Sequence, residues 1–215
     1  MIRLLSFFYP ITRKVKSNYS GTVEITWYNG KKQLNSENAN YSYGSLQKIL
    51  KTGLQKTELN HCKNILLLGL GGGSVIKTLR DDLDYDHKII AIDIDPVIIS
   101  IAHNEFNIIE DNNLEIICID ALEFMAQNDK RFDLIIIDLF VDTEIPDSFY
   151  SHSFWQHIIK ATSPKGSILF NASLHDYDDK KLTSIIKLLN KNNFNIEKLE
   201  RVNKTNTLII ASSSS

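Results

Sequence analysis

The chain is poor in the residues on which metal sites, disulfides and membrane anchors depend. Its 215 residues include two cysteines, Cys62 and Cys118, which lie in or beside apolar runs and have the character of small reduced residues. The six histidines are scattered, without the spacing that a metal site needs. No apolar run reaches the roughly 18 residues that span a bilayer, and no small-residue cleavage site follows the slightly apolar start. We therefore expect no bound metal, no membrane partner and a cytoplasmic location.

An excess of charge of either sign is also missing. The chain has 24 Lys and Arg residues against 26 Asp and Glu residues, for a formal net charge of −2. Surfaces that bind nucleic acid or anionic membranes need concentrated positive charge, so neither partner is expected. Hydrophobic residues make up 43% of the chain, which is enough for a packed core and argues against global disorder.

The most informative segment runs from Asn64 to Ser74. An apolar strand leads into the glycine-rich turn Gly69-Leu70-Gly71-Gly72-Gly73, and a helix-like stretch follows at once. Such a turn lies at the carboxyl end of a strand, where glycines let a nucleotide-like ligand approach the backbone. The next apolar run ends in Asp93, 24 residues after Gly69, where a carboxylate can accept both hydroxyls of a ribose. The segment predicts a nucleoside-binding half-site.

From residue 64 onward, strands and helices alternate. We expect strands at 64–69, 88–93, 114–119, 133–138 and 166–171, and helices at about 74–81, 96–106, 121–128, 151–161 and 176–191. Continuously apolar strands such as Leu134–Ile137 are typical of a parallel sheet with helices on both faces. Two closely linked strands at 194–200 and 207–211 indicate an antiparallel hairpin at one sheet edge. The prediction is an α/β, doubly wound, Rossmann-like fold with a seven-stranded sheet.

Residues 1–60 differ from the rest of the chain in their pattern of residues. The β-rich run Thr22–Tyr28, the turn signal Asn29-Gly30 and a return strand from Lys31 predict a small N-terminal β-hairpin unit. A linking helix is expected at 45–54. The predicted division is therefore 1–60 for the N-terminal unit with its linking helix, and 61–215 for the ligand-binding α/β domain.

Two further acids follow strands at the edge that carries Asp93. Asp120 ends the third strand and Asp138 the fourth, so all three lie where open α/β sheets bind ligands. Each acid could instead cap the helix that follows it, and this alternative stays open for Asp120 and Asp138. A dinucleotide fingerprint, G-x-G-x-x-G, requires glycine where this chain has Ser74. A dinucleotide-dependent oxidoreductase is therefore disfavoured.

The order and spacing of these motifs resemble one family. The glycine turn, Asp93, Asp120 and the terminal hairpin resemble the class I S-adenosylmethionine-dependent methyltransferase fold. Within that superfamily, the chain is most similar to the spermidine synthase family. The segments that carry this likeness are Tyr28–Leu34, Val75–Arg80, Ala91–Ile98 and Phe132–Asp138. The resemblance implies a methyltransferase-like domain at 61–215 and a ligand that is S-adenosylmethionine or its decarboxylated form.

The resemblance also implies a role for each candidate residue. Asp93 would bind the ribose hydroxyls, and Asp120, with Ala121 beside it, would accept a hydrogen bond from the adenine amino group. Gln33 would reach the nucleoside from the N-terminal hairpin, and Asp138 is the implied catalytic residue. The glycines expected to let the backbone approach the methionine part are Gly69, Gly71 and Gly73. Family members often form homodimers through the N-terminal unit, which the apolar segment Leu4–Tyr9 permits here.

The chain departs from the family where a polyamine would bind. The family's glycine loop carries an aspartate that pairs with the amine of the decarboxylated cofactor, and here that position is Gly72. The second aspartate of the family's catalytic loop is replaced by Val141, with Asp142 one step later. An acidic pair in the N-terminal segment aligns with Asn38 and Ala39. Because a polycationic amine needs several carboxylates to replace its water, these changes disfavour polyamine synthesis.

We therefore expect a transferase that moves a methyl group from intact S-adenosylmethionine to a small-molecule acceptor. One alternative is an aminopropyltransferase of polyamine synthesis that uses the decarboxylated cofactor. A second is a non-catalytic nucleoside-binding protein, since the catalytic loop is altered. Asp138 is the candidate base that takes a proton from the acceptor.

Overall fold

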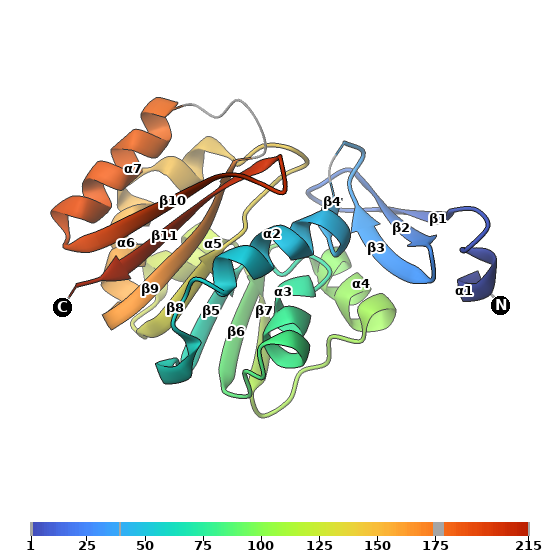
Figure 1. The fold of residues 1–215 in the computed structure, drawn as a ribbon, viewed down its shortest axis with the longest axis horizontal. Coiled ribbons are helices and arrows are strands. Elements are labelled where there is room, and N and C mark those ends of the chain that lie inside the picture. Colours follow the sequence, from blue (N-terminus) through green and yellow to red (C-terminus); the bar gives the residue numbers. More distant parts are fainter. Residues whose placement is uncertain (1, 39, 174–178, 215) are drawn as a thin grey trace.

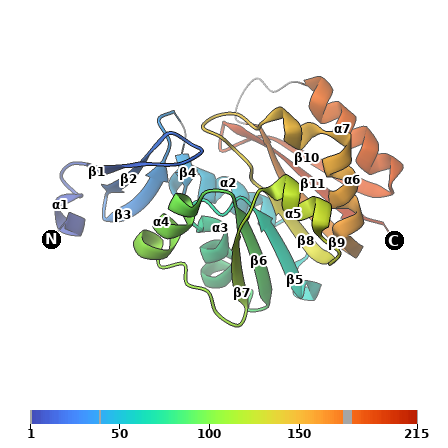
Figure 2. The ribbon, with the colours of Figure 1, turned by 180° about the vertical axis from the view of Figure 1, so that it is seen from behind.

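Two β-sheets organise the protein, a large one in the centre and a small one towards the N-terminus (Figure 1). The computed structural model describes residues 2–38, 40–173 and 179–214. In both views the N-terminus lies at the end of the molecule that carries the small sheet, and the C-terminus lies at the opposite end (Figures 1 and 2).

The large sheet has seven strands in the order β10-β11-β9-β8-β5-β6-β7. These strands are β5 (Asn64–Leu68), β6 (Lys88–Asp93), β7 (Leu114–Cys118), β8 (Phe132–Ile137), β9 (Thr162–Ser173), β10 (Phe194–Val202) and β11 (Asn206–Ser213). The neighbouring strands from β7 to β9 pair in parallel, while β11 runs antiparallel between β9 and β10. The predicted doubly wound sheet and its antiparallel C-terminal hairpin are confirmed.

Helices cover both faces of the large sheet, as continuously apolar strands require. On one face lie α2 (Gly44–Leu54), α3 (Ser74–Lys77) and α4 (Pro96–Phe106), and on the other lie α5 (Ala121–Gln127), α6 (His152–Ala161) and α7 (Asp179–Lys191) (Figures 1 and 2). Successive β5 residues serve opposite faces: Leu67 packs in the first layer and Leu66 in the second. The start of the expected helix 176–191 lies outside the described residues.

The strand expected at 166–171 begins four residues earlier, at Thr162. Pro164-Lys165-Gly166 lies inside β9, near a register shift between Phe132 and Leu134 of the neighbouring strand. Lys165 takes a φ of 62° there, so the irregular backbone accommodates the proline and bends the start of β9 without ending it.

The small sheet holds more strands than the predicted hairpin. Its order is β1-β2-β3-β4, all antiparallel, with β1 (Ile11–Lys16), β2 (Thr22–Tyr28), β3 (Lys31–Asn35) and β4 (Asn40–Ser42). The hairpin of β2 and β3 is as expected. The edge strands β1 and β4 were missed because β1 is largely exposed and rich in charge, and β4 has three residues. A short helix, α1 (Ile2–Leu5), precedes the sheet.

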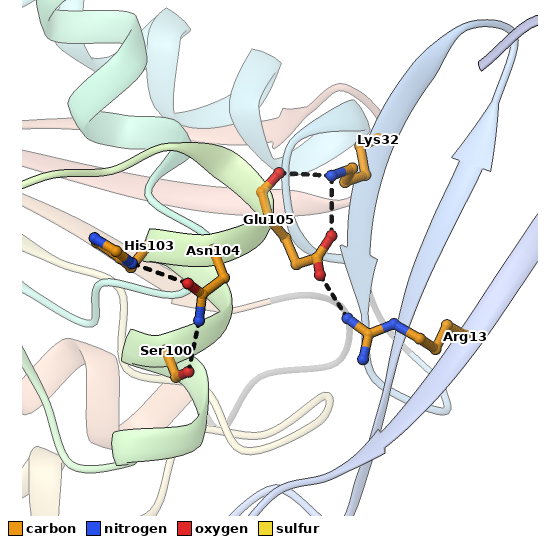
Figure 3. Close-up of polar contacts among 6 residues, drawn as sticks. All are labelled: Arg13, Lys32, Ser100, His103, Asn104 and Glu105. Carbon is orange, nitrogen blue, oxygen red and sulfur yellow. Dashed lines mark hydrogen bonds and ion pairs between the residues drawn. The ribbon is translucent and has the colours of Figure 1, made fainter. Parts of the chain in front are cut away.

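Glu105, at the end of α4, holds the small sheet against the large unit (Figure 3). Its carboxylate pairs with Arg13 of β1 at 2.6 Å and with Lys32 of β3 at 2.9 Å. The Lys32 ammonium also donates to the Glu105 carbonyl oxygen at 2.8 Å. Hydrogen bonding from Lys32, together with the charges of both cations, lowers the pKa of Glu105.

Glu105→Gln is expected to lower the free energy of unfolding by about 1 kcal/mol near pH 7, because the ion pairs are only partly shielded from water. The pKa of Glu105 is lower in the folded protein than in the unfolded chain. The ion pairs therefore stabilise the fold at pH values above the unfolded pKa, and this stabilisation is lost as the pH falls through the folded pKa. Thermal denaturation from neutral to acid pH measures this. The control is Glu197→Gln, whose pair with Lys56 is about half exposed and should contribute little.

Candidate functional site

A cavity of about 290 Å³ opens at the carboxyl ends of the central strands. It lies where the chain, having built β6 and β7 on one side of β5, crosses to β8 on the other side. Open α/β sheets bind ligands at such a reversal of strand order. Candidate residues that line the cavity are Gly69, Gly71, Asp93, Asp120, Ala121 and Asp138. Five of the predicted site positions therefore meet there with the predicted catalytic residue.

The backbone of Gly69, the first glycine of the turn, packs closely against the backbone of Asp138. Its φ is +95°, and a Cβ at this position would overlap the Asp138 carbonyl oxygen. The Asp138 amide in turn donates to the Leu68 carbonyl at 2.9 Å. The first glycine is therefore required both by backbone conformation and by the close approach of the next strand end.

Gly69→Ala is expected to lower the free energy of unfolding by 3 kcal/mol or more, roughly, because both a left-handed backbone and a backbone clash oppose the methyl group. Gly21→Ala is the matched control, since Gly21 has a φ of +67° but nothing within 4 Å of its would-be Cβ. That variant should lose only about 1 kcal/mol. Equal losses in chemical denaturation would contradict the proposed contact.

The last two glycines of the turn, Gly72 and Gly73, pack against protein. A Cβ on Gly73 would lie 2.4 Å from Cγ1 of Ile108, and a Cβ on Gly72 would lie 2.9 Å from Cβ of Ser42. Neither residue lines the cavity. The Ser42 hydroxyl also accepts the Ser74 amide at 3.3 Å, so β4 lies directly on the turn. Gly72 thus has no room for a side chain.

Asp93 ends β6 at the wall of the cavity. Its Oδ2 accepts the Gly71 amide at 3.1 Å and its Oδ1 accepts the Asp95 amide at 3.0 Å. Each oxygen keeps a further lone pair for a ligand. Desolvation raises the pKa of Asp93 to about 6, against the lowering effect of the backbone hydrogen bonds.

Asp120 caps the helix that follows it and also lies at the cavity wall. Its Oδ1 accepts the Leu122 amide at 2.6 Å and caps α5, while the residue also lines the cavity beside Ala121. A cap uses one carboxylate oxygen, which leaves the other for a ligand.

Asp138 lies at the end of β8 and faces the same cavity. Its Oδ1 accepts the side-chain amide of Asn171 at 2.8 Å. Desolvation raises the pKa of Asp138 to about 6, and the Asn171 hydrogen bond acts in the opposite direction. A carboxylate with a raised pKa beside a ligand cavity is suited to proton transfer near neutral pH.

Asp142 does not offer a free carboxylate to a ligand. Its oxygens accept the Ser36 hydroxyl at 2.5 Å, the Asn38 side-chain amide at 2.7 Å and the Asn38 backbone amide at 3.1 Å. These hydrogen bonds, the one from Ser36 most of all, lower the pKa of Asp142. Asp142 therefore joins the loop after β8 to the turn between β3 and β4. Ala39, the other half of the segment aligned with the acidic pair, lies outside the described residues.

Gln33 lies away from the cavity lining. It is on β3, and its Nε2 comes within 3.2 Å of where a Cβ on Gly44 would stand, at the start of α2. The implied contact of Gln33 with a nucleoside stays a prediction.

Asp95 is a site residue that the sequence analysis did not single out. It is buried, and its Oδ2 accepts the hydroxyl of Ser17 and the backbone amides of Asn18 and Tyr19, the amides at 3.0 Å and 3.4 Å. These bonds bring Tyr19 and Ser20, from the turn between β1 and β2, to the cavity wall. The position of Asp95 before Pro96 signals a helix cap but not the long-range contact.

The structure also bears on the predictions about metal ions and membranes. Across residues 2–38, 40–173 and 179–214, no three His, Cys, Asp or Glu side chains are grouped so as to hold a metal ion. Within those ranges, none of the helices combines the length and apolar character needed to cross a bilayer.

Comparison by sequence gives one matching family and several relatives. A model of the spermine/spermidine synthase domain matches residues 47–204. The eEF1A lysine and N-terminal methyltransferase homolog of Drosophila melanogaster is 29% identical over 145 residues, which cover 62% of this chain and 21% of that protein. The polyamine aminopropyltransferase of Chromobacterium violaceum is 32% identical over 110 residues, 51% of this chain and 42% of that protein. The chain thus aligns with less than half of either relative's length.

Solved structures share the fold. Human methyltransferase-like protein 13 in complex with SAH superposes with a TM-score of 0.65 at 21% identity, over 79% of this chain and 82% of that one. A probable spermidine synthase from Corynebacterium glutamicum superposes with a TM-score of 0.67 at 15% identity, over 96% of this chain and 78% of that one. At these identities the comparison establishes the fold alone.

Proposed function

The chain belongs to the spermine/spermidine synthase family, and from that membership we propose that it is a transferase that moves a methyl group from S-adenosylmethionine to a small molecule. The proposal includes a division of the chain at residue 60, a cytoplasmic location and a homodimer formed through the N-terminal unit. It includes no nucleic-acid or membrane partner.

The residues around the cavity fit the nucleoside part of S-adenosylmethionine. Asp93 keeps a lone pair on each oxygen for the two ribose hydroxyls, and Asp120 keeps one oxygen for the adenine amino group. The described apolar residues of the same wall include Ile94, Ile119 and Leu139, which suit a flat base. Gly69 and Gly71 would let the methionine part approach the backbone.

The packing around Gly72 is the observation that favours methyl transfer over aminopropyl transfer. In the spermidine synthase family, an aspartate at this position pairs with the amine of decarboxylated S-adenosylmethionine. Here, Ser42 and Tyr43 cover Gly72 closely enough to exclude a side chain. Without that aspartate, nothing at this position attracts the lone amine or repels the carboxylate of the intact cofactor.

Asp138 would act on the acceptor. S-adenosylmethionine supplies a methyl group on a positively charged sulfur. The second carboxylate oxygen of Asp138, Oδ2, has no hydrogen-bond partner among the described residues, so it can accept a proton from an amine or hydroxyl that enters the cavity. Positioning of the acceptor beside the methyl group supplies the rest of the catalysis.

The charge of the cavity supports a second candidate, aminopropyl transfer. Among the described residues that line it are five aspartates, Asp93, Asp95, Asp120, Asp138 and Asp142, and no lysine or arginine. Such a lining favours a cationic acceptor, and an amine is the acceptor class common to both candidate reactions. However, protein groups already occupy Asp95 and Asp142, which leaves less free acid than a polyamine needs.

Calorimetric titration with S-adenosylmethionine and, separately, with its decarboxylated form tests the proposal. Tighter binding of the intact cofactor is expected. Tighter binding of the decarboxylated form would overturn the Gly72 argument and favour aminopropyl transfer. Cofactor binding without turnover across a panel of small amines would favour the non-catalytic alternative. If neither form of the cofactor bound, the proposed nucleoside site would be wrong.

A further inference from the structure

Two fully buried asparagines lie beside Asp138 at the ligand edge of the large sheet. Asn171 on β9 and Asn206 at the start of β11 are both 0% exposed, and both line the cavity. Their strand neighbours Phe170 and Leu208 belong to the hydrophobic core. A buried primary amide that lacks hydrogen-bond partners destabilises the fold, so the contacts of these two side chains need a reason.

The two amides form a hydrogen-bond chain that ends on Asp138. The Thr205 hydroxyl donates to Asn206 Oδ1 at 2.7 Å, Asn206 Nδ2 donates to Asn171 Oδ1 at 2.9 Å, and Asn171 Nδ2 donates to Asp138 Oδ1 at 2.8 Å. Every donor in the chain points towards the carboxylate. The register of β9 and β11, with Leu208 opposite Asn171, brings the two asparagines together.

The direction of the chain depends on the charge of Asp138. An ionised carboxylate is an acceptor only, so it requires the nitrogen of the Asn171 amide to face it. Asn206 donates to the oxygen of the same amide, and a reversed Asn171 would set oxygen against oxygen and nitrogen against nitrogen. Asn206 therefore fixes which end of the Asn171 amide faces Asp138.

We propose that Asn171, oriented by Asn206, is a positioning residue that holds Asp138 in its ionised form with the second carboxylate oxygen free for the acceptor. The acceptor's part in this statement rests on the proposed function. The hydrogen bonds themselves do not, because they are made within the protein. The hydrogen-bond chain ends on one oxygen of a carboxylate at the cavity wall, and the other oxygen of that carboxylate has no hydrogen-bond partner among the described residues.

Carboxyl-carbon NMR titration of protein with ¹³C-labelled aspartate, without cofactor, tests the proposal. The Asp138 signal is assigned by its loss in Asp138→Asn. Separate signals matter because other titratable groups line the same cavity, namely Tyr19, Asp93, Asp95, Asp120 and Asp142. The wild-type midpoint of Asp138 is expected at about 6, where burial and the Asn171 bond balance.

Asn171→Leu removes the donor and should raise the Asp138 midpoint by about one pH unit or more, because a charge-assisted hydrogen bond is lost. Asn206→Leu should raise it by less, because Asn171 keeps its donor but loses its orientation. Thr162→Val, at the other end of β9, is the matched control and should leave the midpoint unchanged. If Asn171→Leu does not fold, the double variant Asn171→Leu with Asn206→Leu removes both buried amides and carries the same expectation.

An unchanged Asp138 midpoint in the Asn171 variants, or an equal rise in Thr162→Val, would overturn the positioning role. Failure of the proposed function is a separate result. If the protein binds neither form of the cofactor but shows the expected Asp138 midpoints, the positioning role of Asn171 is supported and the proposed transferase activity is contradicted.

Discussion

Replacing Asp93 with asparagine is expected to weaken binding of S-adenosylmethionine by about a thousandfold, because two charge-assisted hydrogen bonds to ribose hydroxyls are lost. The carboxylate is held in place by the amides of Gly71 and Asp95, so its orientation is set before a ligand arrives. An asparagine at 93 keeps one acceptor oxygen but turns an N–H donor towards one of those amides.

Asp133→Asn is the matched control for this substitution. Asp133 also accepts two backbone amides, those of Lys63 at 2.8 Å and Asn64 at 3.2 Å, but at the opposite end of the sheet. Cofactor affinity, measured by calorimetry, should be unchanged in the control. A loss of affinity that is equal in the two variants would mean that the effect comes from stability and not from the site.

The affinity of the wild-type protein should also depend on pH. Because the pKa of Asp93 is raised to about 6, the carboxylate is ionised above that pH and protonated below it. Binding that needs the ionised form should weaken as the pH falls through 6, by about tenfold for each further pH unit. The Asp93→Asn variant should lack this dependence.

Replacing Asp138 with asparagine is expected to lower turnover by about 10²- to 10⁴-fold, because the acceptor loses the base that takes its proton. The same change should stabilise the protein above pH 6. An asparagine keeps an oxygen for the Asn171 amide and removes a charge that burial disfavours. Activity and stability should therefore move in opposite directions.

The pH window follows from the raised pKa of Asp138. The folded protein binds this proton more readily than the unfolded chain between about 4 and 6, so the wild type loses unfolding free energy as the pH rises through that window. The stability gained by Asp138→Asn should therefore be complete above pH 6 and absent below about pH 4. Denaturant titrations at several pH values measure the difference.

Asp142→Asn is the contrasting variant, because the pKa of Asp142 is lowered in the folded protein. The wild-type Asp142 carboxylate stabilises the fold at pH values above its unfolded pKa, and this stabilisation is lost as the pH falls through its folded pKa. The variant should therefore be less stable than the wild type near neutral pH. If both substitutions changed stability with the same sign, the assignment of burial as the cause at Asp138 would be wrong.

The central part of the fold follows from local sequence signals. Continuous apolar strands, the glycine turn and the acids at strand ends each have a physical meaning within a few residues of chain. The predicted strands at β5, β6 and β8, and the meeting of Asp93 and Asp138 in one cavity, came from such signals.

The remaining site features depend on contacts between distant segments. Hydrogen bonds join Asn206 to Asn171, 35 positions away in the sequence, and Asp95 to Ser17, 78 positions away. Asn206 belongs to a polar stretch that looks like an ordinary loop. Strand β1 is mostly exposed and charged, and its apolar residues are Ile11 and Val15, so its sequence gives little signal and its place is determined by pairing with β2. Such features arise from tertiary packing and leave little local pattern.

The covering of Gly72 also restricts how this protein can change over evolution. A mutation that introduced aspartate there would meet Ser42 and Tyr43 before it met any ligand, so it would be selected against for loss of stability alone. The segment at 42–43 would have to move first, and that earlier step brings no gain in amine binding. The neighbours of Gly72 thus keep this position a glycine whatever ligand the cavity binds.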